Sequence, residues 1–262
     1  MPDKQKMKGM VAIVTGASRG IGRAIAIEYG RQGAVVVAAS RAASPTGLPG
    51  TAEQTAYQIA SLGGKALAVH CDVTDEKQVK SMVDEVMAKY GKIDVLVNNA
   101  GLIIVGDKFL DIEPARWDKL MAINIRGPYL CCRYVAQVMV KQKRGSIINV
   151  GSRMGADPTT GGGTAYSASK AALHMLSFTL AEELREHNVA VNIYSPGSVK
   201  TEGAWLNEWN HKNWDSRYEP EASGPCAVYL ALQSAESLTG RYLHRDDFGK
   251  KWGPAELIQK PA

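Results

Sequence analysis

A glycine-rich turn, placed between an apolar strand and an amphipathic helix, constrains the fold of this chain more than any other feature. The apolar residues 11–14 lead into TGASRGIG at residues 15–22, and apolar side chains then recur at helical spacing. Glycines in such a turn allow tight closure, close approach of the backbone to a diphosphate, and close packing of the helix on a sheet. Free N–H groups and the dipole at the start of the helix attract phosphate. A glycine pattern alone is weak, but this context predicts a dinucleotide-binding unit.

The rest of the chain alternates short apolar runs with amphipathic stretches, which is typical of a parallel sheet covered by helices. Three consecutive valines at 35–37 suit a strand that is buried on both faces. We therefore expect an α/β fold, a doubly wound Rossmann-type domain whose parallel sheet has about seven strands and carries helices on both faces. Further strands are expected at 34–39, 65–71, 93–97, 146–150 and 189–194, and helices at 52–62, 114–142 and 164–187, with another capped by Thr74.

Composition excludes several other classes of protein. The chain has 262 residues, of which 45% are hydrophobic and 22% charged, so it is not a disordered chain, a coiled coil or a collagen-like repeat. No apolar run approaches the ~20 residues that a membrane span needs, and the polar residues 1–10 do not resemble a secretory signal. No linker, repeat or charge block divides the chain, and we expect one domain over residues 1–262.

Charge and cysteine usage limit the kinds of binding partner and the cellular location that the sequence predicts. The net charge is +5, but the basic residues are scattered and balanced by 26 acids, so nucleic-acid binding is not expected. Cys131 and Cys132 are adjacent, while Cys71 and Cys226 stand alone, which gives neither a disulfide framework nor the spacing of a metal site. We therefore expect no metal and a reducing, cytoplasmic location.

A tyrosine and a lysine four residues apart form the candidate catalytic pair. Tyr166 and Lys170 fall on one face of a predicted helix, which follows a strand that ends at Ser152. A free tyrosine, with a pKa near ~10, is a poor base at neutral pH. A lysine cation held nearby favours the phenolate, lowers the tyrosine pKa and makes the pair a usable general acid/base.

The end of the second strand bears on which nicotinamide dinucleotide is bound. An acidic residue there binds the ribose 2′-hydroxyl, whereas a basic residue accommodates a 2′-phosphate. This chain has Ser40 and Arg41 at that place, and Arg19 in the glycine turn adds a second cation. Because arginine forms forked hydrogen bonds with phosphate, these residues favour NADP(H) over NAD(H). The alternative is that both arginines are solvated loop charges.

Short motifs follow one another along residues 8–201. They are TGASRGIG at 15–22, CDV at 71–73, NNAG at 98–101, Asn124, Ser152, YSASK at 166–170 and PGSVKT at 196–201. Each is weak alone, but in this order the series closely resembles the short-chain dehydrogenases/reductases of the compact type. The resemblance implies that residues 202–220 form a lid over the substrate and that 221–262 supply a C-terminal helix, a last strand and a tail.

The resemblance also implies roles for individual residues. Tyr166 acts as the acid/base on the substrate oxygen, Ser152 hydrogen-bonds the same oxygen, and Lys170 holds the nicotinamide ribose and lowers the tyrosine pKa. Asn124 anchors a water molecule in a proton relay; its other reading is a polar residue that kinks the helix. The cofactor-binding set is Gly16, Ser18, Arg19, Gly20, Ile21, Gly22, Ser40, Arg41, Asp72, Val73, Asn98, Ala100, Gly101, Tyr166, Lys170, Pro196, Gly197, Val199 and Thr201.

Two features depart from the family pattern. Ser152 and Tyr166 are fourteen positions apart, one more than the commonest spacing. The segment LTGRYLHRDDFGKKWG at 238–253 begins like the family's last strand but lacks the usual glycine-rich ending. The predicted lid carries Trp205, Trp209, Trp214 and Tyr218, which either contact a bulky, apolar substrate or pack the lid onto the body or a partner subunit.

The expected activity is the NADP(H)-dependent interconversion of a ketone or aldehyde and its alcohol. The alternatives are a cofactor-sensing binding protein, or an isomerase or dehydratase built on the same scaffold. The resemblance implies a small-molecule partner and a homodimer or homotetramer. An apolar face around Cys131, Tyr134, Val135 and Val138 would suit subunit contact, or else would be a buried core face.

Overall fold

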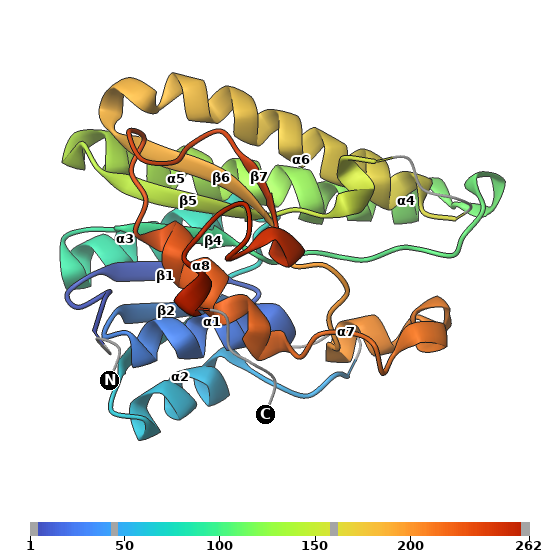
Figure 1. Ribbon diagram of the computed structural model, residues 1–262, viewed down its shortest axis with the longest axis horizontal. Coiled ribbons are helices and arrows are strands. Elements are labelled where there is room, and N and C mark those ends of the chain that lie inside the picture. The colour runs from blue at the N-terminus through green and yellow to red at the C-terminus, as the bar shows by residue number, and fades with distance from the viewer. Residues whose placement is uncertain (1–4, 43–46, 158–161, 258–262) are drawn as a thin grey trace.

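Seven parallel strands form one sheet in the computed structural model, which describes residues 5–42, 47–157 and 162–257. The strand order is β3-β2-β1-β4-β5-β6-β7, as in a doubly wound fold (Figure 1). The expected fold class is confirmed. The strands are β1 (Val11–Thr15), β2 (Val35–Ser40), β3 (Lys65–His70), β4 (Val95–Asn98), β5 (Gly145–Val150), β6 (Val189–Ser195) and β7 (Tyr242–His244).

Helices cover both faces of the sheet. Alternate residues of each strand point to opposite faces, so β1 sends Ala12 and Val14 to one core cluster and Val11 and Ile13 to the other. The first cluster packs under α1 (Gly20–Arg31), α2 (Ala52–Ser61) and α8 (Gly224–Ala231). The second packs under α3 (Glu76–Tyr90), α5 (Gly127–Gln142) and α6 (Thr164–Glu183). The remaining helices, α4 (Pro114–Met121) and α7 (Glu202–Trp205), lie together at one end of the molecule in Figure 1.

The long helix expected at 114–142 is interrupted at Asn124. It consists of α4, a π-helical segment at Ala122–Arg126, and α5. A π-helical turn accommodates one extra residue, and here it carries the Asn124 side chain into the interior, where its exposure is 1%. The kinking interpretation of this residue therefore describes its local structure. The helix expected at 164–187 ends as α6 at Glu183 and is followed by a 3₁₀ turn at Arg185–His187.

The expected helix cap at Thr74 is wrong. Asp75, and not Thr74, caps α3, because the Asp75 carboxylate accepts from the amides of Lys77 and Gln78. Thr74 instead donates to Asp72. Cys131 and Val135 are fully buried in the second core cluster, which supports the alternative that this part of the apolar face belongs to the core.

All four cysteines are buried free thiols. Burial raises the pKa of the Cys71 and Cys132 thiols to about 12, so these groups stay protonated and inert at neutral pH. Among the described residues, no helix is both long and apolar enough to cross a membrane.

Candidate active site

A cavity of about 1320 Å³ lies at the carboxyl ends of the strands. The strand order reverses between β1 and β4, and a crevice at that point is the usual ligand site of a doubly wound sheet. Most of the predicted site residues line this one cavity: Gly16, Ser18, Arg19, Gly20, Ile21, Ser40, Arg41, Asp72, Val73, Ala100, Gly101, Ser152, Tyr166, Lys170, Pro196, Gly197, Val199 and Thr201. Gly22, Asn98 and Asn124 are not among its lining residues.

The glycine turn has the shape of a phosphate cradle. Gly16 and Gly20 adopt φ values of +64° and +53°, a region that residues with a side chain rarely enter. Arg19 precedes α1 but its side chain does not cap the helix, so the first N–H groups of α1 have no side-chain acceptor there. Free amide donors at a helix N-terminus beside a cavity fit the diphosphate of a dinucleotide.

Asn99, which the sequence interpretation missed, holds this turn in place. Its side-chain amide donates to the carbonyl oxygens of Thr15 (2.9 Å) and Gly16 (3.2 Å), and Asn99 lines the cavity. Asn98 was predicted to line the cofactor cleft, and this is wrong: it is the last residue of β4, 3% exposed, and donates to Asn149 and to the Cys132 sulfur. Strand alternation explains the difference, because adjacent residues at a strand end point in opposite directions.

The two arginines predicted to bind a 2′-phosphate are held differently. The Arg19 guanidinium donates to three backbone carbonyls, those of Leu48, Pro49 and Gly50, at 2.8–3.1 Å. Arg19 therefore ties the loop before α2 to the glycine turn. Arg41, which directly follows β2, is exposed, lines the cavity and forms no ion pair with the residues that the structure describes.

Ser152, Tyr166 and Lys170 meet at the centre of the cavity. Tyr166 and Lys170 come from the first two turns of α6, and Ser152 follows β5. The Lys170 ammonium donates to the Val150 carbonyl (2.8 Å) and lies 5.7 Å from the centre of the Tyr166 ring. Both side chains are buried, at 6% and 9% exposure. The spacing of fourteen residues between Ser152 and Tyr166 therefore still brings the two residues to one site.

Burial dominates the ionisation of this pair. It raises the pKa of Tyr166 to about 12, and the hydrogen bond with Ser152 opposes the rise. Burial also lowers the pKa of Lys170 to about 8, because a desolvated ammonium is destabilised. Burial therefore outweighs the lowering of the tyrosine pKa that the sequence argument expected from Lys170, whose ammonium donates to the Val150 carbonyl.

His174, one turn beyond Lys170 on α6, supports the serine. The Ser152 amide donates to Nε2 of His174 (3.4 Å), and the imidazole packs against Tyr242 with ring centres 5.1 Å apart. Burial and the Lys170 charge lower the pKa of His174 to about 4, so the ring is neutral and can accept this bond.

Asn124 links the π-helical segment to the segment that follows β4 and to α6. Its side chain accepts from the Leu102 amide (2.8 Å) and donates to the Leu102 carbonyl (2.9 Å) and to the Ser169 hydroxyl (3.0 Å). The structure therefore assigns the Asn124 side chain to joining the segment after β4 to α6, next to Lys170.

The predicted lid, residues 202–220, is attached to the body at several points. Glu202 pairs with Arg23 of α1 (2.8 Å), and Asn207 donates to the Val105 carbonyl (2.8 Å). At the other end, the Tyr218 amide donates to the Ser198 carbonyl (2.9 Å). These contacts hold the lid against the glycine turn and against the segment that follows β6.

The tryptophans of the lid pack on their own segment. Trp205 stacks on His211 with centres 4.2 Å apart and meets the edge of Trp214 at 4.7 Å. Neither Trp205 nor Trp214 lines the cavity, and the side chain of Trp209 lies outside the described residues. Trp205 and Trp214 therefore do not support contact with a bulky, apolar substrate, whereas Tyr218 is a lining residue.

The unusual C-terminal segment also reaches the cavity. His244 is the last residue of β7, so it lies at the same sheet edge as the other strand ends, and both His244 and Asp246 line the cavity. The Asp246 carboxylate accepts from the Tyr218 hydroxyl (2.8 Å), and the Arg245 guanidinium lies 3.4 Å from the Tyr218 ring centre. His244 was not among the predicted site residues; its position at the end of a strand is the sequence feature that could have identified it.

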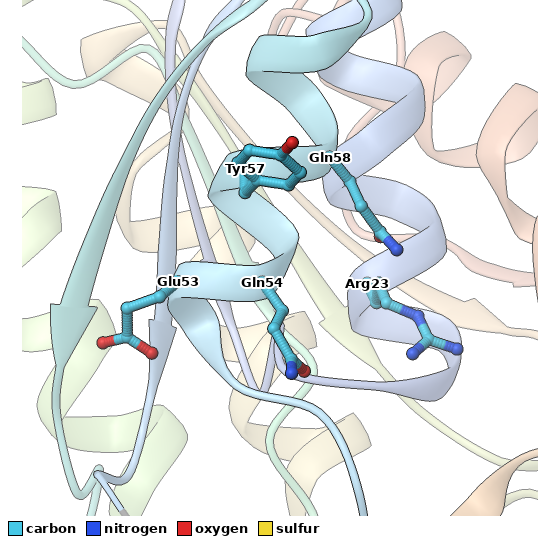
Figure 2. Close-up of a pocket in the computed structure, with 5 residues that line it drawn as sticks. All are labelled: Arg23, Glu53, Gln54, Tyr57 and Gln58. Carbon is cyan, nitrogen blue, oxygen red and sulfur yellow. The ribbon is translucent and has the colours of Figure 1, made fainter.

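A second depression lies between α1 and α2 and is open to solvent (Figure 2). Arg23 comes from α1, while Glu53, Gln54, Tyr57 and Gln58 come from α2. Arg23 already pairs with Glu202, and Glu53 with His70. The two charged residues that line the depression are therefore already paired with other protein side chains. No cluster of three or more candidate metal ligands occurs among residues 5–42, 47–157 and 162–257.

Comparison with known proteins agrees with the geometry. The model of the short chain dehydrogenase family matches residues 10–211. The chain is 34% identical to mouse (Mus musculus) dehydrogenase/reductase SDR family member 1, over 97% of this chain and 85% of that protein. It is 36% identical to the 3-oxoacyl-[acyl-carrier-protein] reductase FabG of Thermotoga maritima, over 92% of this chain and 98% of that protein.

A solved structure with a similar fold contains NADP. A metagenomic short-chain oxidoreductase in complex with NADP has a TM-score of 0.76 and 36% identity, covering 92% of this chain and 98% of that chain. The ordered motifs, the cavity at the strand-order reversal and these likenesses lead to one conclusion. The chain belongs to the short-chain dehydrogenase/reductase family, in its compact form.

Proposed function

We propose that the protein is an NADP(H)-dependent oxidoreductase that interconverts a ketone or aldehyde and its alcohol. The observation that carries the proposal is the meeting of Ser152, Tyr166 and Lys170 in the same cavity as the glycine turn. One end of that cavity fits a dinucleotide, and the other end presents two hydroxyl groups to a reacting oxygen. This pairing suits the joint movement of a hydride and a proton, in which the bound nicotinamide supplies the hydride chemistry.

Three side chains have separate roles in the proton transfer and in binding. Tyr166, with its pKa raised to about 12, holds a proton that it can donate to a carbonyl oxygen as that oxygen gains charge. Ser152 directs a hydroxyl at the same oxygen and stabilises the developing charge. Lys170, fixed by the Val150 carbonyl, holds a positive charge beside the tyrosine and is placed to bind the nicotinamide ribose. The protonated tyrosine favours the reductive direction at neutral pH.

The two directions of the reaction are expected to differ in pH dependence. Oxidation of an alcohol needs the phenolate of Tyr166, which is scarce below its raised pKa, so the rate should increase about tenfold per pH unit from about pH 6 to pH 8. Reduction uses the protonated form, which is present throughout, and should change by less than about twofold. Initial rates in both directions, followed at the reduced-nicotinamide band, measure this difference. An oxidation rate independent of pH would exclude Tyr166 as the proton acceptor.

The preference for NADP(H) is part of the proposal and depends on Arg41. This exposed cation follows β2 in the cofactor end of the cavity, where no acidic residue precedes it, and a relative of known structure is in complex with NADP. Arg19 is committed to the loop carbonyls, so Arg41 is the better placed partner for a 2′-phosphate.

Replacing Arg41 with alanine should weaken NADPH binding by about tenfold or more, since one charge-assisted contact is lost. NADH binding should change by less than about twofold, because NADH lacks the 2′-phosphate. Fluorescence titration with each cofactor measures both affinities. Arg133→Ala on α5, outside the cavity, is the matched control. Equal affinity of the unmodified protein for the two cofactors would contradict the proposed preference.

We also propose a cytoplasmic homodimer or homotetramer. The four free thiols suit a reducing compartment. Tyr129 on α5 and Met175 on α6 are 46% and 64% exposed, which suits contact between subunits through these helices. Light scattering of the purified protein gives the mass in solution, and the mass of a single chain would overturn the proposed assembly.

A further inference from the structure

The substrate end of the cavity carries an excess of positive charge. Beyond the cofactor end, the charged lining residues on the described part of the chain comprise five basic and two acidic side chains. The basic ones are Arg116 and Lys119 of α4, Arg153, and Lys212 and Arg217 of the lid, and the acidic ones are Asp157 and Asp246. In Figure 1, α4 and residues 202–220 lie toward the same end of the molecule, and both groups of cations line one cavity.

Several of these cations already have acidic partners. Arg116 pairs with Asp107 at 2.6 Å, and Arg153 lies 4.0 Å from Asp246. Lys119 and Lys212 are exposed and form no ion pair within the described ranges. Exposed lysines attract an anion at long range but contribute little to its affinity, because water screens them. The lysines alone therefore do not define a binding site.

Arg217 differs because the fold holds it rigidly at the cavity wall. The next residue, Tyr218, exchanges backbone hydrogen bonds with the segment after β6: its amide donates to Ser198 (2.9 Å) and its carbonyl accepts from Lys200 (2.8 Å). The Arg217 amide also donates to the Trp214 carbonyl (3.1 Å). Its backbone is therefore fixed relative to Gly197 and Val199, which line the nicotinamide end.

The tryptophan cluster supports the guanidinium of Arg217 as well. The guanidinium carbon lies 5.6 Å from the Trp214 ring centre, and Trp214 is held against Trp205. The side chain is half-buried, and burial lowers the pKa of Arg217, so an anion bound beside it would stabilise its charged form more than an anion beside a fully solvated arginine would. The guanidinium remains charged, because its ordinary pKa is far above neutral pH.

We propose that the substrate carries an anionic group, a carboxylate or a phosphate, away from its reacting carbonyl, and that Arg217 binds that group. The proposal rests on the proposed carbonyl–alcohol chemistry and names the substrate class for it. A planar guanidinium matches the oxygens of either anion through two parallel hydrogen bonds. The role of Trp205 and Trp214 is then to build the platform that positions Arg217.

Matched pairs of carbonyl compounds test this assignment. The carboxylate arm compares 4-oxopentanoate with its methyl ester, and the phosphate arm compares dihydroxyacetone phosphate with dihydroxyacetone. For each compound, kcat/KM with NADPH is measured on the full chain and on Arg217→Met, which keeps the length of the side chain and removes its charge. Arg217→Lys keeps the charge, and Arg31→Met, at the far end of α1, is the control for loss of a surface arginine.

The unmodified protein should favour at least one anionic compound over its neutral partner by about tenfold. Arg217→Met should reduce that ratio to about twofold or less, mainly through KM, while Arg217→Lys keeps most of it and Arg31→Met all of it. Equal use of charged and neutral compounds by the unmodified protein would overturn the proposal, and so would a preference that survives in Arg217→Met. A preference in the carboxylate arm identifies the bound group as a carboxylate, and a preference in the phosphate arm identifies it as a phosphate.

A binding measurement separates this inference from the proposed reaction. Each compound is titrated into the NADPH-loaded protein, and the fluorescence of the bound cofactor is followed. Binding of an anionic compound that depends on Arg217, without any turnover, would support the anion site and count against the oxidoreductase proposal. Turnover of the neutral compounds alone would do the reverse. Anionic compounds that neither bind nor turn over would overturn the anion site.

Discussion

Replacing Tyr166 with phenylalanine is expected to reduce turnover about a thousandfold and to leave NADPH affinity within about twofold. The substitution removes one hydroxyl and keeps a ring that is 9% exposed, so the packing of α6 against the segment after β4 is retained. What is lost is the proton donor beside the substrate oxygen. Ser152 and the bound cofactor remain, and they account for the residual rate.

Turnover is measured at the reduced-nicotinamide band, and NADPH affinity by fluorescence titration of the same preparations. Tyr134→Phe is the matched control, because Tyr134 lies on α5 outside the cavity and its hydroxyl contacts Glu76. If Tyr166→Phe keeps near-normal turnover, the acid/base role belongs to another group. If it loses NADPH binding as well, the effect is structural and the assignment is not supported.

Replacing Gly22 with alanine is expected to abolish dinucleotide binding and to destabilise the fold by about 1–3 kcal/mol. A Cβ at this position would lie 2.4 Å from the Gly16 carbonyl oxygen and 2.3 Å from the Asn99 side-chain nitrogen. The first is a backbone atom of the phosphate cradle, and the second is the group that holds the cradle to the end of β1. Neither can move without opening the turn.

Fluorescence titration with NADPH and thermal unfolding without cofactor measure the two effects separately. Gly203→Ala is the control for stability, because a Cβ there meets no atom within 4 Å and the residue lies in α7. Its melting temperature should be unchanged or slightly higher, as alanine is the better helix former. Unaltered cofactor binding in Gly22→Ala would show that the turn tolerates a wider opening than its packing implies.

Much of the fold follows from the periodicity of apolar residues and from the turn-forming residues in the sequence. The glycine turn, the valine-rich second strand and the apolar spacing of α1 are local signals, and each predicts the element that forms. The catalytic pair is also local, because Tyr166 and Lys170 are separated by one helical turn. Features of this kind depend on neighbours in the chain, which a single sequence displays directly.

The residues that were misread depend on contacts between distant segments. NNAG offers two asparagines, and only the pairing of β4 with β5 decides that Asn98 points into the core and Asn99 into the cavity. The choice between Arg19 and Arg41 depends on the loop carbonyls that Arg19 reaches. Burial, which sets the pKa of Tyr166, likewise arises only when the segments that cover α6 come together.

The attachment of the lid has a consequence for how the chain can diversify. Reaction geometry rests on contacts such as Lys170 to Val150 and Asn99 to Thr15, which join α6 and the segment after β4 to the ends of sheet strands. Arg217, by contrast, belongs to a connecting segment that is fastened to this frame largely through backbone bonds, together with the ion pairs of Glu202 and Glu219 and the bond from Asn207 to the Val105 carbonyl. Backbone bonds do not depend on side-chain identity. Substitutions in the connecting segment can therefore alter which molecules are accepted while the reacting groups and the sheet keep their arrangement.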